Sequence, residues 1–129
     1  MPSPALPRPT DAELTILRVL WSKGPSTVRQ VHDVLASGHA PGYTTVLKLL
    51  QIMTDKGLVV RDERARTHVY EAASSEVQTQ KQLVTDLLDR VFDGSAAKLV
   101  LQALSTGKAT PAELAEIRKL LDKHRGGRK

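Results

Sequence analysis

Four short segments of this chain carry the signature of a helix start, and together they determine most of what it can fold into. In each, a Ser or Thr is followed three residues later by Glu or Gln, and in this capping box the two side chains bond each other's backbone N–H groups. The segments are TDAE from Thr10, TVRQ from Thr27, SEVQ from Ser75 and TPAE from Thr110. The sequence therefore predicts a mainly helical protein.

Apolar residues recur every three or four positions after each of these starts and in two further segments. This period, with the Gly and Pro residues that end it, predicts six helices. They cover residues 11–22, 28–36, 43–56, 76–92, 96–104 and 111–124. In the first three we expect the core to be formed by Leu14, Leu17, Leu20, Trp21, Val28, Val31, Leu35, Val46, Leu49, Leu50 and Met53.

The period of the apolar residues changes to two between the third and fourth predicted helices. LVVRDE from Leu58 and THVYEA from Thr67 alternate apolar and polar residues, which predicts a β-hairpin. Arg64 and Arg66 give this hairpin a basic tip. Three helices followed by a hairpin is the element order of a winged helix-turn-helix, whose second motif helix enters the major groove of DNA.

Residues 43–56 would be the DNA-reading helix of this fold. Its first residues would lie against base edges, and Thr, Lys and Gln side chains can all bond bases. We therefore expect base contacts from Thr44, Thr45, Lys48 and Gln51. The alternative is an ordinary solvated polar face.

A second set of residues is expected to hold the DNA backbone. Arg suits phosphate because of its fork of donors, and the start of the second helix offers a helix N-terminus. The set comprises Thr27, Arg29, Tyr43, Arg64, Arg66, Thr67 and His68. The alternative for the hairpin is a self-paired surface in which Asp62 and Glu63 bond its arginines.

The last three predicted helices carry more apolar surface than roughly 50 residues can bury alone. AAKLVLQAL, residues 96–104, is apolar nearly all round. A second copy would cover this surface, and twofold pairing would set two reading helices about one DNA turn apart, or a multiple. The expected dimer contacts are Leu83, Val84, Leu87, Leu88, Val91, Leu99, Leu101, Leu104, Leu114, Ile117 and Leu121. The alternative is a compact monomer.

Several classes of protein are excluded by what the sequence lacks. It has no cysteine, hence no disulfide or thiolate site, and its four histidines are scattered without metal-ligand spacing. No phosphate loop or nucleophile motif occurs, so we expect no enzyme, metal or cofactor. MPSPALPRP lacks the features of a secretory signal, and a cytoplasmic protein is expected. The net charge of +5 permits a nucleic-acid partner.

The motifs, in this order and spacing, resemble a known family. LTILRVLWSKGPSTVRQVHDVL, YTTVLKLLQIMTDKGLV and HVYEA look like the BlaI/MecI/CopY family of bacterial penicillinase-type repressors. The resemblance implies a winged-helix transcriptional repressor that binds a palindromic double-stranded DNA operator as a homodimer, with a role in antibiotic-resistance regulation. A winged-helix module for protein interaction is the alternative function.

The resemblance also implies a way of relieving repression. Many members are cut in the C-terminal domain by a membrane sensor-protease system, and the copper-responsive branch uses a Cys-x-Cys hook that this chain lacks. The usual Asn-Phe bond is replaced by Gln102-Ala103, which becomes the candidate cleavage bond. Ala65 also stands in the wing turn where a glycine is common.

We therefore expect a mainly α protein with a small β-hairpin wing. An N-terminal winged helix-turn-helix would be followed by a C-terminal three-helix dimerisation domain. The expected bounds are a disordered Pro-rich arm at 1–9, the DNA-binding domain at 10–73, the dimerisation domain at 74–124 and a basic disordered tail at 125–129.

Overall fold

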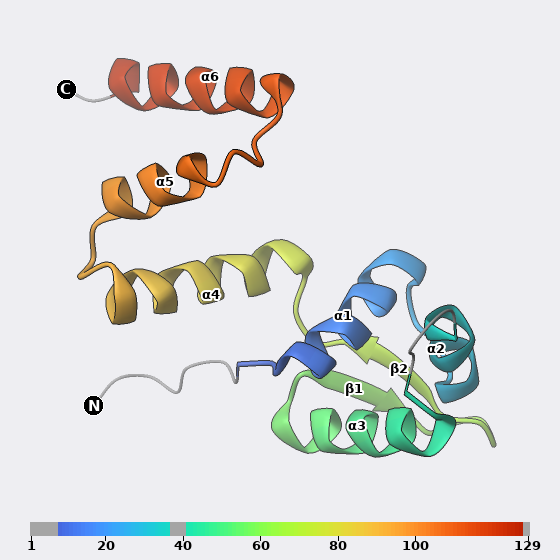
Figure 1. Ribbon diagram of the computed structural model, residues 1–129. Coiled ribbons are helices and arrows are strands. Elements are labelled where there is room, and N and C mark those ends of the chain that lie inside the picture. Colours follow the sequence, from blue (N-terminus) through green and yellow to red (C-terminus); the bar gives the residue numbers. More distant parts are fainter. Residues whose placement is uncertain (1–7, 37–40, 128–129) are drawn as a thin grey trace. The chain divides into compact units, whose positions relative to one another are not determined.

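The computed structural model describes residues 8–36 and 41–127, and its described elements are six helices and one β-hairpin (Figure 1). In chain order they are α1 (Asp11–Lys23), α2 (Val28–Leu35), α3 (Tyr43–Lys56), β1 (Val59–Asp62), β2 (Val69–Ala72), α4 (Glu76–Val91), α5 (Ala96–Ser105) and α6 (Pro111–Gly127). The mainly α fold class with a hairpin wing is confirmed. α3 has the predicted bounds, and the other helices differ from prediction only at their C-terminal ends.

All four predicted capping boxes are present. At α1, Thr10 Oγ1 accepts from the Glu13 N–H at 3.2 Å, and Glu13 Oε1 accepts from the Thr10 N–H at 2.8 Å. The same reciprocal pair of hydrogen bonds occurs at α2, α4 and α6. Local side-chain chemistry thus determines where four of the helices begin.

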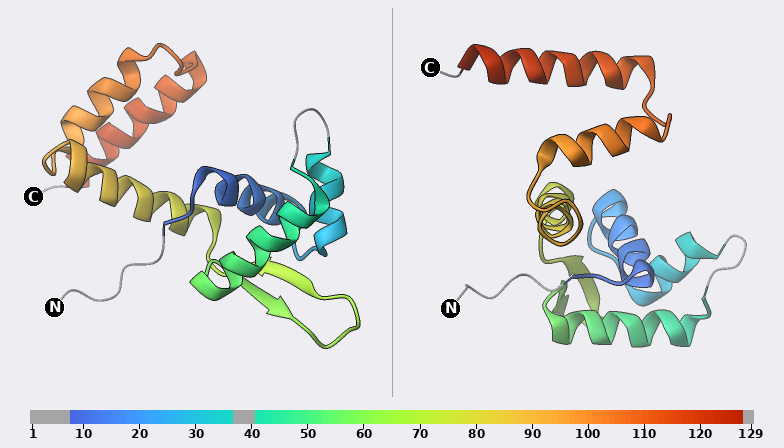
Figure 2. Two further views of the ribbon diagram at one scale, coloured as in Figure 1. Left: turned by 60° about the horizontal axis from the view of Figure 1, so that its bottom comes forward. Right: turned by 60° about the vertical axis from the view of Figure 1, so that its left-hand side comes forward.

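The hairpin is held to the helices by a contact that the sequence did not predict. β1 and β2 pair antiparallel, with Arg61 opposite Tyr70. Ser26, between α1 and α2, extends this sheet: its N–H donates to the Tyr70 carbonyl at 2.9 Å, and the Tyr70 N–H donates back at 2.7 Å. Since Tyr70 is also buried, β2 is fixed to the helices, while the loop between the strands projects away from them (Figure 2).

The core lies between α1, α2, α3 and the hairpin. Its buried residues are Ile16, Leu17, Val19, Leu20, Val28, Val31, Val46, Leu50, Met53, Leu58, Val59 and Tyr70. Four of the residues expected in the core, Leu14, Trp21, Leu35 and Leu49, are partly buried and pack against its edge. Ile16 and Val19 were not predicted to be buried; they are covered because α1 contacts α2, α3 and β2.

The chain divides into two compact units, Met1–Val84 and Thr85–Lys129. The boundary falls inside α4, whereas the sequence placed it before residue 74. The start of α4 belongs to the first unit because Trp21 Nε1 donates to the Ser74 carbonyl at 2.9 Å and Thr79 is buried. The predicted N-terminal arm lies mostly outside the described residues.

The second unit contains the end of α4, α5 and α6. The prediction of a disordered tail at 125–129 is wrong in part, because α6 continues to Gly127. His124 and Arg125 lie in the last turn, where positive charge favours a helix C-terminus. No hydrophobic side chain described in this unit is buried. None of the helices in the described ranges has the length and apolar character that a membrane crossing requires.

Candidate nucleic-acid interface

α3 separates an apolar side from a polar side as the sequence predicted. Val46, Leu50 and Met53 are fully buried against the rest of the unit. The four expected base-reading residues are all exposed on the same helix, and we call them the reading face: Thr44, Thr45, Lys48 and Gln51. The packing of the buried residues therefore fixes the orientation of the reading face.

The N-terminus of α3 carries no side-chain cap. Its N-cap is Gly42, which cannot bond the first-turn N–H groups, whereas the other five described helices all have a Ser or Thr cap. The first N–H groups of a helix have no intrahelical partner and form its positive end. Thr44 and Thr45 add hydroxyls in the same turn, so this end of α3 can donate to acceptors on a ligand.

Arg29, His32 and Tyr43 form a cluster that joins α2 to the start of α3. The Arg29 guanidinium lies 5.2 Å from the centre of the Tyr43 ring, and the His32 ring meets the same ring edge-on at 5.9 Å. Arg29 and Tyr43, both expected on the DNA backbone, are thus brought together. Cation–π contact restricts the Arg29 side chain beside the reading face.

The role of His32 in this cluster was missed in the sequence. Its Nδ1 is buried without a hydrogen-bond partner among the described residues, and the nearest carboxylate oxygen, Asp33 Oδ1, lies 3.9 Å away. The available signal was spacing: His32 follows Arg29 by three residues and therefore lies on the same face of α2.

Thr27 is occupied by the capping box of α2. Its hydroxyl accepts from the Gln30 N–H at 3.1 Å, and its own N–H donates to Gln30 Oε1 at 2.9 Å. A phosphate at this end of α2 would therefore meet the N–H groups of Val28 and Arg29.

Two wing arginines are paired with wing carboxylates, as in the self-paired alternative for the hairpin. Arg64 Nε lies 3.0 Å from Asp62 Oδ1 and Arg64 Nη2 lies 2.7 Å from Asp62 Oδ2. Arg61 Nε lies 2.6 Å from Glu63 Oε2. Hydrogen bonds from the Arg64 side chain and backbone N–H lower the pKa of Asp62 to about 2.

Arg66, Thr67 and His68 are exposed in the wing loop. Arg66 makes no ion pair within the part of the chain that the structure describes. The two wing arginines of the predicted backbone set therefore differ: Arg64 is paired with Asp62, and Arg66 has no ion pair among the described residues.

The expected dimerisation residues lie on α4, α5 and α6, and every one is at least partly exposed. The most exposed of them is Leu101 on α5, at 66%. Leu83 and Val84 precede the boundary between the units, and the other nine follow it. The candidate cleavage pair Gln102 and Ala103 is exposed inside α5.

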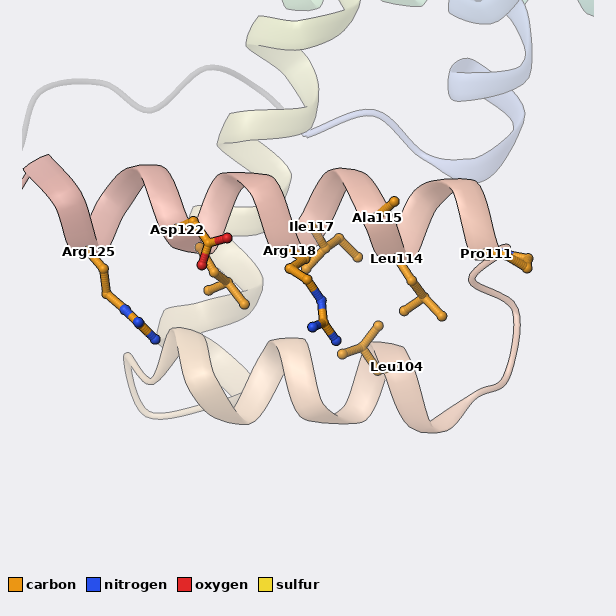
Figure 3. A pocket seen from close by; sticks show the side chains of 9 residues that line it. Leu104, Pro111, Leu114, Ala115, Ile117, Arg118, Asp122 and Arg125 are labelled. Carbon is orange, nitrogen blue, oxygen red and sulfur yellow. The ribbon is translucent and has the colours of Figure 1, made fainter.

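α5 and α6 enclose an open groove of about 700 Å³ (Figure 3). Leu114 and Arg118 of α6 point toward α5, and Leu104 of α5 points back toward α6. The groove is lined by Leu104, Pro111, Leu114, Ala115, Ile117, Arg118, Leu121, Asp122 and Arg125. No set of three potential metal ligands occurs among the residues that the structure places.

A family model described as "Penicillinase repressor" matches residues 9–123. The chain belongs to the penicillinase-repressor family. This confirms the family that the motifs resembled. The family consists of transcriptional repressors and not of enzymes.

Two relatives agree with this family assignment. The repressor chain is 33% identical over 97 residues to the transcriptional regulator BlaI of Mycobacterium tuberculosis, covering 74% of this chain and 70% of that protein. It is 23% identical over 124 residues to the penicillinase repressor of Bacillus licheniformis, covering 96% and 97%. A solved structure of the Bacillus licheniformis BlaI monomeric form with the blaP half-operator is 24% identical with a TM-score of 0.49, covering 55% of this chain and 87% of that one.

Proposed function

We propose that this repressor binds double-stranded DNA by inserting the start of α3 into the major groove. The observation that carries the proposal is the uncapped start of α3, with exposed threonines in its first turn and a fully buried apolar side behind it. Such a helix end offers free N–H donors and hydroxyls, and its packed apolar side fixes their position. The reading face would contact bases, while Arg29, Tyr43 and the wing would contact phosphates.

We also propose that the repressor acts as a homodimer on a palindromic operator. The exposed leucines and valines of α4, α5 and α6 leave the second unit without a core of its own. A second copy supplies surface of the same kind and would fill the groove between α5 and α6. Membership of the repressor family and the expected twofold symmetry of an operator support this assembly.

The test is selection of bound duplexes from a random pool by the full-length protein, followed by titration of the recovered duplex at increasing salt. Specific binding should give a two-half-site motif, and affinity should fall linearly with salt on logarithmic axes. If no duplex is preferred at low salt, the DNA-binding proposal is overturned in favour of a protein-interaction module.

Relief of repression would follow from loss of the dimer. Gln102 and Ala103 lie inside α5, and a protease that cut there would first require local opening of the helix. We propose that such a cut, made by a membrane sensor-protease system, is one route to relief. An immunoblot of induced cells tests it, because intact repressor that persists while the target gene is expressed would exclude cleavage.

A further inference from the structure

Two carboxylates of the wing occupy guanidinium groups that the wing would otherwise offer to DNA. Asp62 accepts from both Nε and Nη2 of Arg64 and also from the Arg64 backbone N–H at 3.0 Å. Glu63 accepts from Nε of Arg61. Each pair joins residues two positions apart, so both pairs form within the wing itself.

We propose that Asp62 and Glu63 act as built-in competitors of phosphate and limit how strongly the wing holds any duplex. The inference rests on the proposed DNA binding. Carboxylate and phosphate are alternative bidentate acceptors for the same guanidinium donors. A phosphate that approaches Arg64 along its Nε and Nη2 edge must displace Asp62, and the released carboxylate then repels the DNA.

The charge balance of the wing supports this proposal. Residues 61–66 contain three arginines and two carboxylates, which leaves a net charge of +1 where the arginines alone would give +3. Of these arginines, Arg66 is the one without an ion pair in the described ranges 8–36 and 41–127. Because salt dependence counts the phosphates that a protein neutralises, and Arg61 is also held by the Tyr70 side chain, the wing should contribute about one phosphate contact, from Arg66, instead of the two that exposed Arg64 and Arg66 could make.

The Asp62–Arg64 pair is available to competition because it faces solvent. The Arg64 side chain is 91% exposed and that of Asp62 is 41% exposed. An exposed ion pair contributes little free energy, since water screens both charges. A phosphate can therefore open the pair, at a cost that weakens every complex in which it does so.

The variant that tests the proposal is Asp62→Asn in the full-length protein. Asparagine keeps an oxygen acceptor for the Arg64 backbone N–H, so the wing turn is preserved while the competing charge is removed. Two probes are used: a duplex of random sequence and the tightest duplex recovered by selection. Asp62→Asn should bind both roughly two- to fivefold more tightly, the range set by an exposed pair. The slope of log affinity against log salt should steepen by up to about one.

The matched control is Glu71→Gln, which removes the same charge from the same hairpin. Glu71 is exposed on β2 opposite Val60, and it has no ion pair in the described part of the chain. This variant should change affinity less than Asp62→Asn. Glu63→Gln should also tighten binding less than Asp62→Asn, because Arg61 additionally bonds the Tyr70 side chain and stays partly held without Glu63.

Three results would overturn the inference while leaving the proposed function intact. If Asp62→Asn and Glu71→Gln tightened binding equally, the gain in affinity would come from the change in net charge and not from the Asp62–Arg64 pair. Weaker binding of the selected duplex alone would show that Asp62 orients Arg64 for a base contact. Unchanged binding of both duplexes would show that the pair has no role. Failure of the wild-type protein to bind any duplex would overturn the proposed function and this inference together.

Discussion

Lys56 Nζ lies 2.7 Å from Oε1 of Glu13, so the last turn of α3 is joined to the capping box that starts α1. The Glu13 side chain is 3% exposed and that of Lys56 is 32% exposed. Glu13 also accepts from the Thr10 N–H. The buried Glu13 carboxylate therefore caps the start of α1 and also bonds the last turn of α3, the proposed reading helix.

Stability should depend on pH through this carboxylate. Burial acts to raise the pKa of Glu13, but the hydrogen bonds from Lys56 and Thr10 outweigh it and lower the pKa below its ordinary value of 4.5. A lowered pKa in the folded state gives stability that is present above pH 4.5 and is lost as pH falls through the folded pKa. The free energy of unfolding, measured by urea titration, should therefore fall as the pH is lowered from 4.5 through the folded-state pKa of Glu13.

Glu13→Gln should lower the free energy of unfolding by about 1–2 kcal/mol at neutral pH, because the buried charge-assisted bond is lost. The difference from the wild type should shrink as the pH falls from 4.5 through the lowered folded-state pKa, where the carboxylate of the folded wild type also becomes protonated. Glu113→Gln is the control, since Glu113 has the same place in the capping box of α6 but is exposed. A difference that does not change with pH would contradict the assignment.

The reading face should determine sequence preference. Thr44→Ala or Gln51→Ala is expected to relax preference at one or two operator positions, each costing about 1–3 kcal/mol against the selected duplex. Binding of random duplex should change little. Competition binding with single-position operator variants measures this. Thr15→Ala, an exposed threonine on α1, is the control. Equal loss on random and selected duplexes would show that these residues contact the backbone.

Arg66 should contact the phosphate backbone of DNA and not the bases. Arg66→Ala is expected to weaken all duplexes by a similar factor and to flatten the salt slope by about one, as for one lost phosphate contact. Arg18→Ala removes an exposed arginine from α1 and provides the control. Salt titrations of both variants make the comparison. An altered sequence preference in Arg66→Ala would instead place this side chain on a base.

Leu101 should be essential for assembly. Leu101→Glu is expected to give a folded monomer, because the exposed leucine contributes nothing to the core of either unit. Operator affinity should fall by about a hundredfold or more as the two half-sites become independent. Sedimentation and operator titration measure the two effects. Gln102→Glu adds the same charge at the next residue as a control. A Leu101→Glu protein that remains dimeric would remove α5 from the interface.

The sequence predicted the features that local chemistry determines. The bounds of α3, four capping boxes and both strands follow from short segments, because caps and periodicity act over a few residues. The hydrogen bonds between Ser26 and Tyr70 and the ion pair between Glu13 and Lys56 were not predicted. Each joins residues more than 40 positions apart in the chain, and no local pattern indicates such a contact.

The site was predictable to the same extent. The exposed positions of α3 follow from the helical period, so the exposure of the reading face could be predicted, while its contact with bases stays a prediction. The state of the wing arginines could not be decided, because RDERAR from Arg61 permits either free or paired side chains. The three-dimensional turn brings Asp62 to Arg64 and resolves that choice.

The hydrogen bond from Trp21 to the Ser74 carbonyl also gives the protein an optical reporter of its own. Trp21 is the chain's single tryptophan, and both tyrosines, Tyr43 and Tyr70, belong to the same unit. Intrinsic fluorescence therefore follows the N-terminal unit, which includes the start of α4, and does not report on α5 and α6. Far-ultraviolet circular dichroism sees both units. Melting curves recorded by the two methods would coincide if the halves unfold together and separate if they unfold one after the other, without any label.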